Sequence, residues 1–154
     1  MEKLIYELDK YFITNTRLRN FEKILRGIEL NEFIQNEITE YNKNISMNRK
    51  VLYSNVKYEV VLFIFNGNYE SSIHDHSSNG CVLKVIKGKL YQTLYNNKMS
   101  KCLVEDSTIE LNENDTFYIE NEEYMHKIIN NSDFSMSLHI YSPPGYKCMY
   151  PIKL

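Results

Sequence analysis

The chain has 154 residues, of which 43% are hydrophobic and 25% charged, proportions that are usual for one globular domain. A formal net charge of -2, with no cluster of Lys and Arg, argues against a nucleic-acid partner. Charged residues interrupt the first ten positions every few residues, so this stretch predicts neither a signal peptide nor a membrane span.

The first third of the sequence predicts helices. Apolar residues recur at helical spacing over residues 4–12 and again over residues 18–25, and the second pattern is broken at Gly27. A third candidate helix runs over residues 33–41, with Asn31 as its N-cap.

From about Val51 the pattern changes to short runs rich in β-branched and aromatic residues, separated by turn residues. These runs are VLY, YEVVLFIF, CVLKVIK, KLYQTLY, TIEL, TFYI, MHKII and FSMSLHIY. Helices followed by short strands, without alternation of the two, favour a mainly β, antiparallel fold that closes into a sandwich, jelly roll or small barrel. We expect one domain over residues 1–154, helical over residues 1–45 and a β-barrel over residues 46–154.

Two of the four histidines form the pair His74 and His76. Side chains two positions apart in a strand point to the same face, so this spacing aims both imidazoles at one point. Imidazole is a ligand for Zn, Fe, Cu and Ni, and His126 lies on a later predicted strand that a closed barrel brings opposite the pair. The alternative is an accidental surface pair and a hydrogen-bonded core histidine. The spacing does not select the metal.

The surroundings of these histidines resemble the two cupin motifs. After His76 come four residues, Cys81, six residues and Gly88, as in the first motif, with cysteine in the place of its glutamate. The run from His126 to Asn130 resembles the H-x-x-x-N end of the second motif, without the proline and glycine that precede it there. Three neutral imidazoles would leave the charge of a divalent metal uncompensated, which favours a thiolate ligand and leaves coordination positions open.

Residues 135–141 alternate between a polar and an apolar face. Ser137, His139 and Tyr141 lie on the polar face, and water is the usual neighbour of such a face. Lys, Glu or Thr would be more usual there, whereas a Ser-His-Tyr row inside a barrel can form a hydrogen-bonded chain that holds the tyrosine hydroxyl near a metal. We favour the interior placement.

Two longer segments are similar to the cysteine dioxygenases. Residues 71–76, followed by Cys81, resemble that family's metal-binding signature, and residues 137–144 resemble its second signature, including the double proline. The resemblance covers the chain from Arg49 to its end. It implies a cupin barrel in which the imidazoles of His74, His76 and His126 hold one Fe(2+) ion, that is, mononuclear Fe(II).

The resemblance also implies the substrates. L-cysteine would chelate the iron through its thiolate and amine, and O2 would take the remaining position. Arg49 matches the carboxylate-binding arginine of the family, and a guanidinium is suited to this because its planar fork binds carboxylates. Relatives acting on mercaptopropionate tend to carry glutamine there. The alternative for Arg49 is a surface arginine, and Met47 stands where the family often has tyrosine.

Cys81 and Tyr141 match two positions that members of the family commonly join by a thioether bond. We expect Ser137, His139, Tyr141 and Cys81 to serve catalysis, with Arg49 and Tyr141 binding the substrate. Two alternatives stay open: a dioxygenase for another small thiol such as 3-mercaptopropionate, and a non-catalytic cupin that binds a metal or small ligand.

The remaining expectations concern the cellular setting. Three cysteines without close spacing argue against a secreted disulfide scaffold and favour reduced thiols in a cytoplasmic protein. We expect a monomer without a membrane partner, in which Cys102 and Cys148 are small buried apolar residues. The Ser142–Pro143 bond matches one that is cis in the family, although the sequence alone favours trans.

Overall fold

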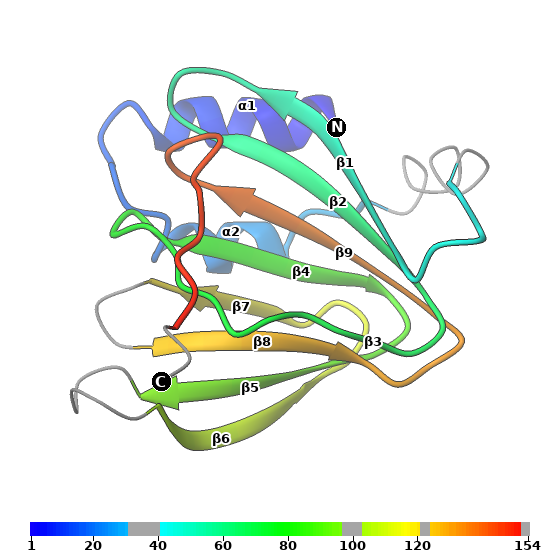
Figure 1. Ribbon diagram of the computed structural model, residues 1–154. Helices are drawn as coiled ribbons and strands as arrows, with labels where there is room; N and C mark the ends of the chain where they lie inside the picture. Colours follow the sequence, from blue (N-terminus) through cyan, green and yellow to red (C-terminus); the bar gives the residue numbers. More distant parts are fainter. Residues whose placement is uncertain (31–40, 97–102, 121–123, 152–154) are drawn as a thin grey trace.

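The computed structural model describes residues 1–30, 41–96, 103–120 and 124–151, and helices precede strands along the chain (Figure 1). The helices are α1 (Glu2–Tyr11) and α2 (Phe21–Arg26). The strands are β1 (Met47–Ser54), β2 (Glu59–Asn66), β3 (Tyr69–Glu70), β4 (Cys81–Lys87), β5 (Leu90–Asn96), β6 (Val104–Leu111), β7 (Thr116–Ile119), β8 (Tyr124–Asn130) and β9 (Phe134–Tyr141).

The eight runs expected to be strands all contribute to these elements, whereas β3 was not expected. The second helix begins at Phe21, so the prediction that its helical pattern starts at Leu18 is wrong. The third candidate helix, over residues 33–41, lies almost wholly outside the described residues.

The strands form two antiparallel sheets, as the sequence predicted. One has the order β1-β2-β9-β4-β7 and the other the order β3-β8-β5-β6. Strand β9 is near the end of the sequence but occupies the middle of the first sheet, between β2 and β4. This crossover places the Ser-His-Tyr row at the centre of a sheet.

The two helices cover one face of the five-stranded sheet (Figure 1). Their apolar side chains pack against alternate residues of β2, β4 and β9, which include Leu62, Val82 and Leu138. The apolar face of β9 is therefore buried under the helices. Its polar face must point to the opposite side, between the two sheets, because successive side chains of a strand alternate.

A buried lysine fastens α2 to the strand that begins at Cys81. The ammonium of Lys84 donates hydrogen bonds to the carbonyls of Leu25, Arg26 and Ile28 at 3.3, 3.2 and 2.7 Å. Leu25 and Arg26 are the last residues of the helix, whose final carbonyls lack partners within it, and Ile28 lies two residues beyond its end. The contact explains how a charged residue is tolerated in an otherwise apolar strand.

Gly88 closes the turn between β4 and β5 in a conformation that a side chain would disturb. Its φ is +75°, and an added Cβ would stand 2.6 Å from the carbonyl oxygen of Phe134. Glycine is therefore required at the last position of the first cupin motif by both backbone conformation and space.

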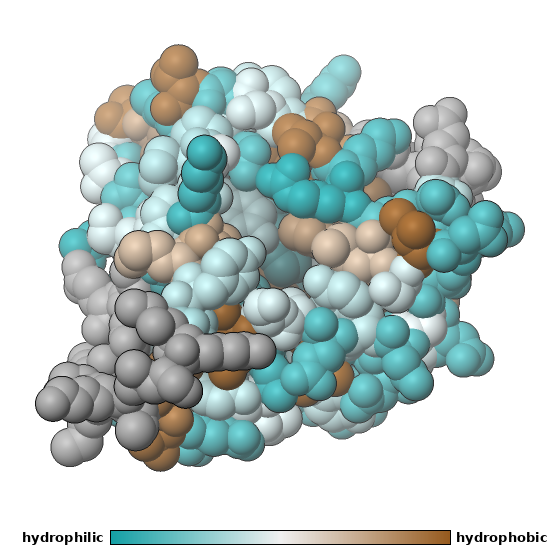
Figure 2. All heavy atoms as spheres, in the orientation of Figure 1, coloured by the Kyte–Doolittle hydropathy of each residue, from teal (hydrophilic) through white to brown (hydrophobic). Residues whose placement is uncertain are grey.

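The peptide bond between Ser142 and Pro143 is cis. This agrees with the family resemblance, and the trans bond that the sequence alone favoured is wrong. Among the described residues, no helix has both the length and the apolar character needed to span a bilayer. Hydrophobic residues on the face shown in Figure 2 are scattered among hydrophilic ones.

Candidate metal centre and its cavity

Three histidines from two segments meet between the sheets. His126 lies in β8, and His74 lies opposite it in the segment between β3 and β4. The two backbones exchange a pair of hydrogen bonds, each 2.9 Å long. The expectation of a regular strand at His74 and His76 is wrong, because the backbone N–H of Asp75 pairs with the carbonyl of Met149 instead of with a neighbouring strand.

The geometry nevertheless aims the three imidazoles at one point. One ring nitrogen from each of His74, His76 and His126 lies within 4.8 Å of the others. His76 and His126 are 1% exposed, and His74 is partly exposed. No other group of this kind is found among the described residues.

The hydrogen bonds of two rings fix which nitrogen faces the shared point. His74 Nδ1 lies 2.8 Å from the carbonyl oxygen of Ser72, so it must carry the proton that it donates. His126 Nδ1 lies 3.1 Å from Oε1 of Gln92 and donates in the same way. In a neutral ring this leaves Nε2 of His74 and His126 with a free lone pair, which is the arrangement of a metal ligand with an oriented outer nitrogen.

Burial keeps these rings neutral. It lowers the pKa of His74 and, much more strongly, the pKa values of His76 and His126. Nδ1 of His76 is buried without a hydrogen-bond partner among the described residues. Neutral imidazoles offer the free nitrogen lone pairs that a divalent transition-metal ion binds, so the three converging rings fit a metal ion.

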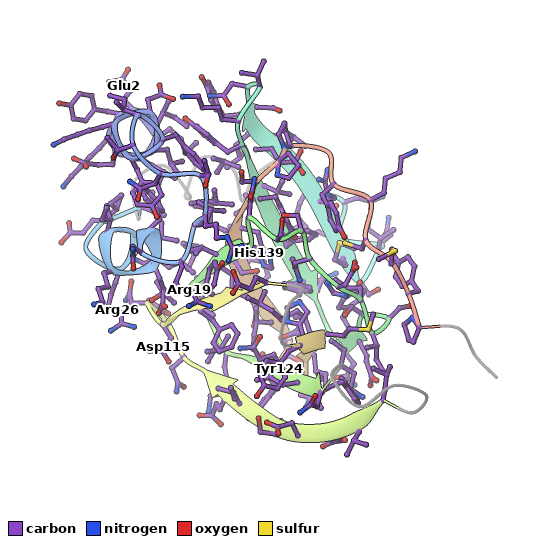
Figure 3. All side chains as sticks on the ribbon, turned by 90° about the vertical axis from the view of Figure 1, so that its left-hand side faces the viewer. Glu2, Arg19, Arg26, Asp115, Tyr124 and His139 are labelled. Atoms are coloured by element: carbon purple, nitrogen blue, oxygen red, sulfur yellow. The ribbon has the colours of Figure 1, made fainter. Side chains whose placement is uncertain are left out.

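The predicted polar row is present in β9. Ser137 Oγ lies 2.9 Å from His139 Nε2, and the Tyr141 hydroxyl lies 3.2 Å from His139 Nδ1. Figure 3 shows His139 in the interior of the molecule, and its edge-to-face contact with the Phe63 ring, at 4.6 Å between ring centroids, holds it there. A neutral imidazole has one donor and one acceptor nitrogen, so His139 donates to one hydroxyl and accepts from the other.

Electrostatics hold this row in its uncharged form. Burial lowers the pKa of His139 to about 3, and burial raises the pKa of Tyr141 well above its usual range. The row therefore presents a neutral phenol, and its orientation depends on hydrogen bonds rather than on ion pairs.

Cys81 is adjacent to this row. It is 1% exposed and is the direct cross-strand partner of Tyr141. Its Sγ lies 4.0 Å from His139 Nδ1, the nitrogen that also contacts the Tyr141 hydroxyl. Burial raises the pKa of this thiol well above its usual range, so it is protonated.

A cavity of about 280 Å³ adjoins the centre, close to the lower end of the usual size range of ligand pockets, which begins at about 300 Å³. His74, His139 and Tyr141 form part of its wall, and so do Arg49 and Glu59. Arg49 Nη2 donates to Glu59 Oε1 at 3.1 Å, and the Arg49 side chain remains 44% exposed. Arg49 is thus a partly exposed residue that reaches the cavity.

The segment after β9 covers one side of the cavity. Asp75, which lies between two of the ligand histidines, accepts hydrogen bonds from the Met149 backbone N–H at 2.6 Å and from the Tyr146 hydroxyl at 3.1 Å. Tyr146 and Cys148 both line the cavity. Cys148 is only partly buried, so the expectation of an inert buried residue is wrong at this position. Cys102 lies outside the described residues.

Sequence reasoning missed Glu59 and Gln92. Glu59 opens the run EVVLFIF, and a single acid at the end of an otherwise apolar strand was the available signal. Gln92 is 0% exposed within KLYQTLY, where a lone buried amide likewise indicates a specific partner. That partner is His126, which no sequence spacing connects to Gln92.

The fold and the three convergent histidines define a cupin whose histidine cluster is suited to bind a metal ion. An oxalate oxidase solved in complex with glycolate is 14% identical, with a TM-score of 0.57 over 73% of this chain and 60% of that chain. A cupin superfamily protein from Desulfitobacterium hafniense is 16% identical, with a TM-score of 0.51 over 67% of this chain and 82% of that one. At these identities the likeness establishes the fold.

Within that class, the chain belongs to the family described as cysteine dioxygenase type I, whose model matches residues 22–150. Cysteine dioxygenase type 1 of Homo sapiens is 35% identical over an alignment of 98 positions that covers 61% of this chain and 49% of that protein. The Danio rerio protein of the same name is 25% identical over an alignment of 159 positions that covers 96% of this chain and 77% of that protein. The chain spans about half the length of the mammalian relatives that it matches.

Proposed function

We propose that this protein is a thiol dioxygenase that uses Fe(II) and adds both atoms of O2 to the sulfur of L-cysteine. The reaction is balanced without another reductant, because a thiol plus O2 gives the sulfinic acid. The observation that carries the proposal is the convergence of three neutral imidazoles, those of His74, His76 and His126, beside a cavity lined by Arg49 and Tyr141.

The residues of the chain would divide the work as follows. His74, His76 and His126 would hold the metal, which supplies the site where the thiol sulfur and O2 meet. Arg49 would bind the substrate carboxylate through guanidinium nitrogens that Glu59 does not occupy. Tyr141 would present a fixed neutral hydroxyl to the cavity.

The remaining residues would position this hydroxyl. His139 holds Tyr141 through Nδ1 and is itself held by Ser137 through Nε2. Cys81 and Cys148 are free thiols, which suits a reducing compartment such as the cytoplasm.

Oxygen uptake tests the proposal. The protein would be reconstituted with Fe(II) without oxygen and then given L-cysteine, 3-mercaptopropionate or cysteamine in parallel, with the sulfinic acid product quantified. We expect uptake with L-cysteine and one sulfinic acid for each O2 consumed. Fastest turnover of 3-mercaptopropionate would instead identify a different thiol dioxygenase, and metal binding without uptake of O2 for any thiol would identify a non-catalytic cupin.

We further expect a thioether bond between Cys81 and Tyr141 to form during repeated turnover. The two residues are direct cross-strand neighbours, and both approach His139 Nδ1. One S–H and one ring C–H bond would break and one S–C bond would form, with the two hydrogens and their electrons passing to O2. The bond would fix the tyrosine hydroxyl and raise activity without being required for it.

Intact-mass analysis before and after turnover checks this expectation, because the linked chain lacks two hydrogens and the bond survives reducing agent. The Cys81→Ser variant is the control and should show no such loss. Unmodified Cys81 and Tyr141 peptides after extensive turnover, with no linked species, would contradict it.

A further inference from the structure

A buried carboxylate shares the substrate cavity with Arg49. Glu59, the first residue of β2, is 7% exposed and lines the cavity together with Arg49, His74 and Tyr141. Among the described residues, its contact with Arg49 joins a single guanidinium nitrogen to a single carboxylate oxygen, 3.1 Å apart. Carboxylates are rarely buried to this extent unless their charge is compensated.

The alternation of side chains along β2 places Glu59 on the face that lines the cavity, opposite the face that packs against the helices. Glu59, Phe63 and Phe65 lie at odd positions of β2 and all line the cavity, whereas the even positions, such as Leu62, pack under the helices. Glu59 is also the direct cross-strand partner of Tyr141. Its carboxylate therefore belongs to the wall that a bound ligand would touch.

The ion pair of Arg49 and Glu59 changes which charged groups of a ligand the cavity favours. Arg49 alone would attract any carboxylate, but a neighbouring carboxylate cancels much of that attraction and repels a second anion. The same carboxylate is an acceptor for amine N–H groups, and Arg49 keeps further donors because it has five and spends one here. An amine and a carboxylate on one ligand would each find a complementary group.

On the basis of the proposed function, we propose that Glu59 is a specificity-determining residue that directs the cavity to thiols carrying an amine. Glu59 accepts a hydrogen bond from the amine, and Arg49 binds the carboxylate where the thiol has one. L-cysteine satisfies both groups and cysteamine satisfies Glu59. A mercaptocarboxylate such as 3-mercaptopropionate satisfies Arg49 and is repelled by Glu59.

The Glu59→Gln variant tests this by changing the charge with little change of shape. The ratio of kcat/KM for cysteamine to kcat/KM for 3-mercaptopropionate should fall by about tenfold or more, as expected for the loss of a hydrogen bond to a charged group. Glu110→Gln is the matched control, because Glu110 pairs with Lys89 at 2.8 Å on the surface, away from the cavity. That variant should leave the ratio unchanged. Glu59→Asp, which keeps the charge, should retain most of the wild-type preference.

A second readout involves no turnover. Saturation-transfer NMR on the metal-loaded protein would compare ethanolamine with 3-hydroxypropionate, which lack the thiol. Glu59→Gln should lose the ethanolamine signal and gain that of 3-hydroxypropionate. Equal changes for both analogues, or none, in a variant that unfolds at the wild-type temperature would overturn the role of Glu59. Absence of O2 uptake by the wild type with every thiol would instead overturn the proposed dioxygenase and leave this binding result standing.

Discussion

Replacing His126 by alanine is expected to abolish stable metal binding, whereas replacing His139 by alanine should leave about one metal ion per chain. The reason is geometric. His126 presents Nε2 to the shared point of the three imidazoles, while both ring nitrogens of His139 are already engaged by Ser137 and Tyr141. The His139 variant should still lose turnover, by ~10–100-fold, a range typical when groups outside the ligand set are removed.

Metal content after reconstitution with Fe(II) and desalting measures the first effect, and oxygen uptake measures the second. Circular dichroism of both variants controls for folding, since both histidines are buried. A His139 variant that loses its metal as completely as the His126 variant would show that the ligand set is wrong.

The Arg49→Gln variant is expected to lose far more kcat/KM for L-cysteine than for cysteamine, which has no carboxylate. Two effects act in the same direction. The substrate carboxylate loses its charged partner, a change that typically costs ~2–5 kcal/mol for a buried contact and less for a guanidinium that is 44% exposed, as that of Arg49 is. In addition, Glu59 is left with its charge uncompensated in the cavity and repels the same carboxylate.

Steady-state kinetics with both thiols measures the change in specificity. Arg49→Lys is the matched control, because it keeps the positive charge and lacks the planar fork, so it should lie between the wild type and the glutamine variant. An equal loss for both thiols, or no loss, would show that Arg49 does not bind the carboxylate.

The β part of the fold could be predicted from the sequence because its signals are local. Runs such as YEVVLFIF and FSMSLHIY combine strand-forming residues with an alternation that survives in the structure as the two faces of β2 and β9. Strand β3 was missed because it has only two residues, Tyr69 and Glu70, and is defined by its pairing with β8. Pairing of this kind joins distant segments and produces no periodic pattern of hydrophobic residues in the sequence.

The candidate site likewise contains residues that local motifs predicted and residues that depend on partners distant in the sequence. The three ligand histidines and the polar row around His139 lie in short motifs, so their types and spacings were informative. Glu59 and Gln92 act through partners 10 and 34 residues away in the sequence, and those partnerships arise only when the sheets assemble. The placement of His74 also depends on tertiary structure, because a bridge to β8 replaces the regular strand that the spacing suggested.

The hydrogen bonds of Asp75 connect the ligand histidines to the segment after β9. This residue joins the two ligand histidines covalently and also holds Tyr146 and Met149, which belong to the stretch that covers the cavity. The backbone that sets the positions of His74 and His76 is therefore tied to one wall of the cavity by these two hydrogen bonds. Loss of the Asp75 carboxylate would remove both contacts at once, so it would disturb the wall of the cavity beside the imidazole cluster.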